Sequence, residues 1–193
     1  MIAKIRYDSP LVLTFALACT IAMALSTITG GRSTMAFFVL GGEFTDFLSW
    51  WRLCTYICGH ADWGHLMSNM SLLLLLGPAL ERHHGAGRLS GMMAFTAIAS
   101  GMVNMLLFDT GLLGASGIVF MFIVLSSFSN ATAGTIPLSF MLVVALFLST
   151  EVISAFRADG ISQLAHLLGG ACGAALGFTH AGTSPTTTGK VPS

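Results

Sequence analysis

Long uncharged stretches alternate with short polar or charged segments along this chain of 193 residues. A helix needs about 20 mainly apolar residues to cross the roughly 30 Å hydrocarbon core of a bilayer, and six stretches match this requirement. The pattern therefore predicts an all-α, polytopic membrane protein with a six-transmembrane-helix bundle over residues 9–181. The stretches are Ser9–Gly31, about Trp63–Leu80, Leu89–Phe108, two crossings between Asp109 and Glu151, and Ile161 to about Ala181.

Local signals support the ends of these stretches. Pro10 stands near the start of the first stretch, and proline is well placed at the first helical position. The polar residues 129–137 end in proline and predict the turn between the fourth and fifth crossings. Residues 1–8 are then expected to be a cytoplasmic N-terminus, and the Ser-, Thr-, Pro- and Gly-containing tail 182–193 is expected to be disordered.

The segment between the first two stretches has its own pattern. Residues 35–40 are apolar but too few to cross a membrane, and Trp50 and Trp51 follow them. Tryptophan is enriched where a membrane meets water. We therefore expect this segment to lie in the outer leaflet.

Composition indicates the same class of protein. The chain is 54% hydrophobic and 8% charged, whereas soluble domains carry about 25% charge, so too little polar surface remains for a water-soluble globule. The eight Lys and Arg residues are dispersed and the formal net charge is zero, which gives no indication of nucleic-acid binding. The four cysteines lack CxxC spacing and predict neither a metal site nor a disulfide framework. No cofactor is expected.

The basic residues predict the orientation. Lys and Arg are more frequent on the cytoplasmic side of a membrane, and an internal N-terminus places five of them inside and three outside. The basic N-terminus with its apolar run is also compatible with a cleavable signal peptide, which would leave five spans. The internal residues are Lys4, Arg6, Arg82, Arg88 and Lys190, and the external ones are Arg32, Arg52 and Arg157.

Polar residues occur at corresponding positions in three stretches. When a chain crosses a membrane back and forth, every second crossing begins on the same side. His65 and Asn69 lie four residues apart in the second stretch, hence on one helical face, and His60 precedes them. Ser116 is near the start of the fourth stretch, and His166 lies in the first turns of the sixth. Polar groups in a membrane often mark function, although a single one can instead join two helices.

Ser116 and His166 have the chemistry of a nucleophile and its base. Gly114 and Gly117 flank the serine, allow backbones to approach closely and leave N–H groups free to point at an anion. Glycines at four-residue steps over 169–177 form a smooth ridge, and a helix carrying Ser116 that packs there would bring its hydroxyl near the imidazole. A neighbouring base activates serine by removing its proton. No carboxylate is obviously placed to orient His166, which favours a dyad over a triad.

The order and spacing of these residues resemble the rhomboid intramembrane serine proteases over roughly residues 50–178. The resemblance implies that Ser116 is the nucleophile, that His166 is its base, and that His65, Asn69 and the Ser116 backbone N–H form the oxyanion hole. The matching motifs are Trp51-Arg52, His60-x4-His65-x3-Asn69, Glu81-Arg82, Gly114-Ala115-Ser116-Gly117 and Ala165-His166-x2-Gly169-x3-Gly173.

The resemblance also implies supporting roles and shows two departures. Trp51-Arg52 would be a structural motif of the first external loop, and Glu81 a packing contact on the cytoplasmic side. Family members often have a tyrosine four positions after the serine that stacks on the histidine. Here Phe120 keeps the aromatic face without the hydroxyl, so activity is expected to survive. No seventh helix or sizeable soluble domain is expected, which fits the minimal bacterial six-helix form.

The resemblance implies a serine endopeptidase of the bacterial inner membrane whose active site is toward the outer face. Its expected substrates are single-pass or C-terminally anchored membrane proteins, cleaved within or near the transmembrane segment in contact with the lipid bilayer. Rhombosortase-like processing of C-terminally anchored proteins and non-catalytic binding of membrane proteins are the alternatives within the family. A transporter or channel would place polar residues along its full depth, whereas the leucines at 72–76 fill the inner half of the second stretch.

Overall fold

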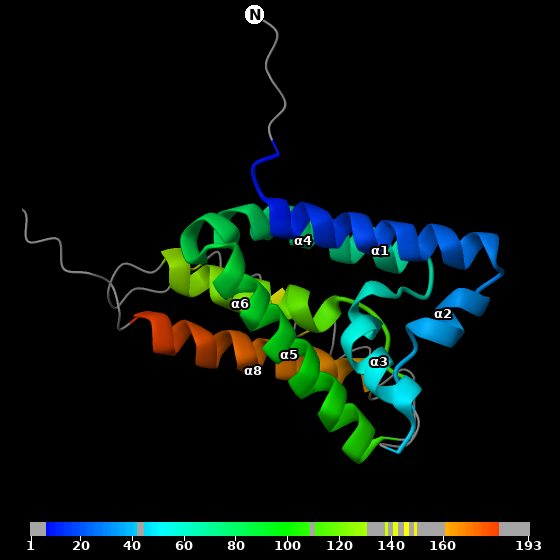
Figure 1. The fold of residues 1–193 in the computed structure, drawn as a ribbon. Helices are drawn as coiled ribbons and strands as arrows, with labels where there is room; N and C mark the ends of the chain where they lie inside the picture. Colours follow the sequence, from blue (N-terminus) through cyan, green and yellow to red (C-terminus); the bar gives the residue numbers. More distant parts are fainter. Residues whose placement is uncertain are drawn as a thin grey trace, which may run out of the picture.

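The computed structural model describes residues 7–41, 45–108, 111–130 and 161–181, with isolated positions between 138 and 149 (Figure 1). These ranges are helical apart from turns and one isolated antiparallel bridge between Leu40 and Leu112. Residues 1–6 and 182–193 lie outside the described residues, as does most of the fifth predicted crossing. The elements are α1 (Pro10–Ile28), α2 (Arg32–Phe37), α3 (Phe47–Thr55), the 3-10 helix η1 (Tyr56–Cys58), α4 (Trp63–His84), α5 (Ala86–Leu107), α6 (Ser116–Asn130) and α8 (Ile161–Ala181).

Helices α4, α6 and α8 run in the same direction and begin at one end of the molecule, on the right in Figure 1. Helix α1 runs the opposite way beside α4. At one end, the Trp63 indole N–H donates to the Thr27 hydroxyl at 3.1 Å. Further along, Gly77 of α4 lies against Val12 near the beginning of α1. This arrangement confirms that alternate helices begin on the same side.

The centre of the bundle is an apolar core shared by α1, α4, α5 and α6. Phe122 of α6 and Leu73 of α4 are fully buried in it, and Leu89 brings in the first turn of α5. Burying a side chain of this size contributes about 1.5–3 kcal/mol. The core therefore fixes the positions of the helices that carry the polar residues.

Helix α4 extends beyond its predicted end. The second stretch was expected to end at about Leu80, but the helix continues through residues 81–84 to Gly85, where φ is +79°. His83 and His84 therefore form its last turn. The helix can continue because the buried Glu81 carboxylate has hydrogen-bond partners.

Glu81 joins the end of α4 to the beginning of α1. Its two carboxylate oxygens accept hydrogen bonds from the backbone N–H groups of Leu11 and Val12, each at 3.0 Å. The first N–H groups of a helix have no partner within the helix, and a carboxylate is favourable near this end of the helix dipole. The contact predicted at Glu81 is therefore present, as a cap on another helix.

The segment between α1 and α4 contains two short helices that the sequence pattern did not predict. Asp46 caps α3 by accepting a hydrogen bond from the Leu48 N–H at 3.0 Å. Arg52 of α3 donates to the carbonyl groups of Met35 and Ala36 at 3.0–3.2 Å. These carbonyls lie near the C-terminal end of α2, so the guanidinium fastens α3 to α2.

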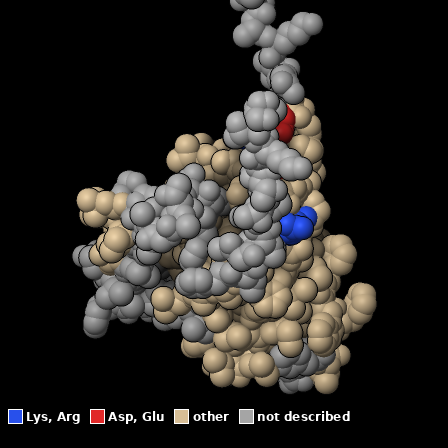
Figure 2. All heavy atoms as spheres, turned by 90° about the vertical axis from the view of Figure 1, so that its left-hand side faces the viewer, with Lys and Arg blue, Asp and Glu red and all other residues tan. Residues whose placement is uncertain are grey.

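Helix length and composition identify two candidate membrane spans in the described part of the chain, α1 and α5. Shorter apolar segments occur at Ser116–Ser127 and His166–Gly177. The complete six-crossing bundle thus remains a prediction. Figure 2 shows the end of the molecule where α1 begins, and most of the described surface in this view carries no charged side chain.

Candidate active site

Ser116 is the first residue of α6, and the loop before it is held from both sides. The Gly114 N–H donates to the Tyr56 carbonyl at 3.0 Å, and Leu112 exchanges backbone hydrogen bonds with Leu40 at 2.7 and 2.9 Å. Gly114 has φ +115°, which glycine adopts far more readily than residues with a Cβ. The glycine therefore allows the chain to enter α6 with Ser116 at its N-terminus.

His65 of α4 lies against this loop. A Cβ added to Gly114 would be 2.8 Å from the His65 Cε1 atom and 3.0 Å from Nε2. Gly114 is thus required both by its backbone conformation and by the imidazole beside it. The Asp62 carboxylate caps α4 by accepting from the His65 backbone N–H at 2.8 Å, which fixes the beginning of the helix. The structure thus brings His65 to the segment of residues 114–117.

Helices α6 and α8 approach so closely that backbone meets backbone. A Cβ on Gly169 would collide with the Gly117 carbonyl oxygen, and a Cβ on Gly173 would be 2.7 Å from the Met121 carbonyl oxygen. In the second pair, both residues lie four positions further along their helices than in the first pair. The two helices α6 and α8 are therefore parallel. Small residues permit this kind of contact between membrane helices. The predicted glycine ridge is present, and it packs against the helix that carries Ser116.

His166 stacks on Phe120. The two ring centroids are 4.8 Å apart and the ring planes differ by 4°. Ser116 and Phe120 are four residues apart on α6, so their side chains share a face. Gly117, the residue after Ser116, lies against Gly169, one turn after His166. The serine and the histidine therefore lie at adjoining ends of two parallel helices.

Asn69 lies one turn after His65 on α4, where only 6% of its surface is exposed. Its Nδ2 atom has no hydrogen-bond partner among the residues that the structure describes. An amide nitrogen carries two donors, and a buried donor without a partner costs about 1–3 kcal/mol. Asn69 thus retains hydrogen-bonding capacity that the described part of the fold does not use.

His60 is buried beside His65. The two rings meet edge to face with centroids 5.0 Å apart, and Nδ1 of His60 lies 3.3 Å from the Cys58 carbonyl oxygen. Burial and, to a lesser extent, the nearby His65 lower the pKa of His60 to about 4. His60 is therefore neutral at physiological pH. His60 therefore lies next to His65 rather than next to Ser116.

The other predicted site residues have different positions. Trp51 is half exposed, and Arg52 holds α2, so both belong to the segment before α4 and not to the serine's surroundings. In the ranges that the structure describes, no three His, Cys, Asp or Glu side chains come together as a metal site would require.

The sequence analysis missed a buried polar face on α5. Thr96, Ser100 and Asn104 are each no more than 3% exposed, and the Thr96 and Ser100 hydroxyls have no hydrogen-bond partner among the residues that the structure describes. Their four-residue spacing places them on one side of the helix and could have been noticed in an otherwise apolar stretch. Tyr56 was also missed. Its hydroxyl donates to the Ala97 carbonyl at 2.9 Å, which ties the loop before Ser116 to α5.

Comparison with known families places these features in context. A family model described as the rhomboid domain matches residues 48–182, which contain Ser116, His166, His65 and Asn69. The chain belongs to the rhomboid family. It is accordingly an integral membrane protein, and the predicted resemblance is confirmed.

Two individual proteins with rhomboid names are similar to this rhomboid chain. YdcA of Bacillus subtilis (strain 168), named as a candidate rhomboid protease, is 30% identical over 135 residues, or 67% of this chain and 66% of that protein. Rhomboid-like protein 11, a chloroplastic protein of Arabidopsis thaliana, is 25% identical over 149 residues, or 69% of this chain and 53% of that protein. The chain therefore spans less than two thirds of the length of each relative.

Proposed function

We propose that this rhomboid-family chain is an intramembrane serine protease in which Ser116 is the nucleophile and His166 its general base. The stacking of His166 on Phe120, one turn from Ser116 on the same face of α6, supports this most strongly. The close contact of Gly117 with Gly169 supports it further, because it keeps the beginnings of the two helices together.

In the proposed reaction, the Ser116 hydroxyl oxygen attacks a peptide carbonyl while the His166 imidazole takes the hydroxyl proton. The resulting imidazolium then gives this proton to the departing amine, and water completes the cycle by hydrolysing the acyl-enzyme. Phe120 covers one face of the imidazole and thus limits its rotation. The ring needs no carboxylate partner to keep this orientation, which is consistent with a Ser–His dyad.

Three donors are proposed to stabilise the oxyanion. The Ser116 backbone N–H lies at the beginning of α6, where a helix favours negative charge. His65 lies against the same loop, and Asn69 offers a buried amide without a partner among the described residues. Removing one such donor from a soluble protease reduces the rate by about 10²–10³. An oxyanion would accept a hydrogen bond from the Asn69 amide.

The proposed substrates are membrane-anchored proteins cleaved within or near their transmembrane segment. A continuous helix keeps its carbonyls in internal hydrogen bonds, so the substrate must unwind locally before Ser116 can attack. The proposed location is a bacterial inner membrane, with the ends of α4, α6 and α8 that carry the site toward the outer face.

The experiment that tests this function compares the wild type with Ser116→Ala in proteoliposomes. The substrate is a single-pass model protein with glycine and proline in its transmembrane segment. We expect the wild type to cleave it and the variant to show only background cleavage, with similar melting temperatures. Undiminished cleavage by the variant would refute the assignment of Ser116.

A further inference from the structure

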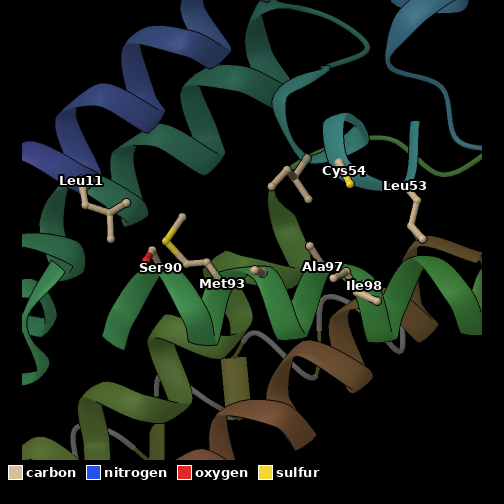
Figure 3. Close-up of a pocket in the computed structure, with 9 residues that line it drawn as sticks. Leu11, Leu53, Cys54, Ser90, Met93, Ala97 and Ile98 are labelled. Atoms are coloured by element: carbon tan, nitrogen blue, oxygen red, sulfur yellow. The ribbon is translucent and has the colours of Figure 1, made fainter. Parts of the chain in front are cut away.

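An apolar groove lies between α1, α3 and α5, away from the serine. It has a volume of about 230 Å³. Figure 3 shows α5 along its floor, with Leu11 of α1 at one end and Leu53 and Cys54 of α3 at the other. The α5 side chains that line it fall between Ser90 and Ile98, and eight residues of helix span about 12 Å. The groove is therefore long and narrow.

The groove opens toward hydrocarbon. Its floor is α5 and one end is Leu11 of α1, and these are the two described helices that are long and apolar enough to cross a membrane. Ala94 and Ile98 are exposed along its rim, whereas Met93 and Ala97 are buried at its floor. In an integral membrane protein, an opening between two such helices meets the acyl chains of lipids.

The size of the groove excludes a helix as its occupant. A helix with side chains is about 10 Å wide, so a 12 Å length of it fills roughly 900 Å³. The free space of the groove, about 560 Å³ with its open mouth included, cannot enclose it. One extended hydrocarbon chain is much thinner and fits a trough of this shape.

The lining also excludes an extended peptide. Ser90 is the only lining residue with a side-chain oxygen, and its hydroxyl already donates to the Gly87 carbonyl at 2.8 Å. Backbone N–H and C=O groups in a membrane need partners, since each one left unpaired costs several kcal/mol. An acyl chain has no such groups and leaves no hydrogen bond unmade.

We propose that this groove binds one acyl chain of a bilayer phospholipid, held between α3 and α5. The site is coupled to the serine by two hydrogen bonds. The Ala97 carbonyl at the floor accepts from Tyr56, and the Tyr56 carbonyl accepts from the Gly114 N–H. A bound acyl chain thus packs beneath the segment around Tyr56, which holds the loop before Ser116.

Photocrosslinking tests this proposal without relying on proteolysis. The full chain is reconstituted in vesicles of phosphatidylethanolamine and phosphatidylglycerol that contain a phosphatidylcholine with a diazirine midway along one acyl chain. After illumination, peptide mass spectrometry locates the label. We expect labelling to concentrate on residues 53–57 and 90–98, relative to the exposed side chains Leu17 and Ile21 of α1.

Two rim variants and one matched control make the result decisive. Ala94→Trp places a large ring in the groove and should reduce labelling there by about tenfold, because affinity falls with every methylene displaced. Ile98→Trp, at another point on the rim, should act in the same way. Phe95→Trp lies on the same helix at a position that is exposed but does not line the groove, and should leave labelling unchanged.

Each contrary outcome overturns the proposal. Labelling spread evenly over α1 and α5 would mean that only the general lipid shell is detected. If labelling of the groove residues persisted in both Ala94→Trp and Ile98→Trp, the acyl chain would have to bind elsewhere. Displacement of the lipid label by a photoreactive transmembrane peptide, or by a second copy of this protein, would identify the occupant as protein.

Discussion

Glu81 and Asn69 lie on the same helix and are each 6% exposed, yet their hydrogen bonding is opposite. Both carboxylate oxygens of Glu81 accept hydrogen bonds from the first turn of α1. The Nδ2 atom of Asn69 has no partner among the residues that the structure describes. A buried polar group stabilises a fold when it is paired and costs free energy when it is not. The comparison shows that Glu81 joins α4 to α1, whereas the Asn69 amide keeps the donor capacity that the proposed function requires.

The histidines give the largest expected contrast between the two ends. His166→Ala removes the proposed base beside Ser116, so cleavage should fall to background while the melting temperature stays close to that of the wild type. His83 and His84 close the other end of α4, and replacing both with alanine should leave the rate largely unchanged. A rate that depended on His83 or His84 as strongly as on His166 would reverse the assignment of the two ends.

Gly169 tests the helix contact at the site end. Gly169→Val forces side-chain atoms against the Gly117 carbonyl oxygen. We expect the free energy of unfolding to fall by about 3 kcal/mol or more, because overpacking in a tight contact distorts the backbone. Melting in detergent checks this.

The neighbouring glycine supplies the control. A Cβ on Gly170 would have its nearest contact at 3.7 Å, to a Val124 methyl. Gly170→Ala should therefore be neutral, or stabilising by up to about 1 kcal/mol through helix propensity. Equal destabilisation by Gly169→Val and Gly170→Ala would show that the backbone contact is not what holds α6 to α8.

Asn69→Ala should separate rate from stability. The variant loses a proposed oxyanion donor, and we expect the rate to fall about 10–100-fold, less than for a lone donor because His65 and the Ser116 N–H share the charge. Stability should hold or rise, since the substitution removes a buried amide. If rate and melting temperature fell together and recovered together, Asn69 would instead be joining two helices.

Glu81→Gln should show the reverse pattern and the smallest effect. Glutamine keeps one acceptor for α1 but loses the charge, so we expect stability to fall by about 1 kcal/mol, as for other helix caps. The rate per folded molecule should not change. A specific loss of rate in this variant, with melting unchanged, would contradict the division of roles along α4.

Much of the helical arrangement follows from the sequence, and its exceptions have physical causes. Helix α8 has the predicted bounds because its apolar stretch follows Asp159 and Gly160 and gives way after Ala181 to the Ser-, Thr-, Pro- and Gly-containing tail. Helix α4 runs past its predicted end because Glu81 finds partners on α1, a contact between residues 70 apart in the chain. Helix α3 was missed because it has nine residues and depends on a cap from Asp46 and on its contact with α2.

The close approach of α6 and α8 was easier to predict than their surroundings. The glycine ridge predicted this contact, whereas the pairing of Ser116 with His166 stays a prediction. The polar face of α5 went unnoticed because threonine, serine and asparagine are common in helix contacts and carry no motif. The role of Tyr56 depends on its long-range hydrogen bond with Ala97, which no local pattern reveals.

Covalent labelling measures the reactivity of Ser116 directly. The purified protein is treated with a fluorophosphonate, and the modified residue is identified by peptide mass spectrometry. We predict a single adduct on Ser116 that is absent from Ser116→Ala and greatly slowed in His166→Ala. An adduct on another residue, or equal labelling in Ser116→Ala, would contradict a Ser116–His166 dyad.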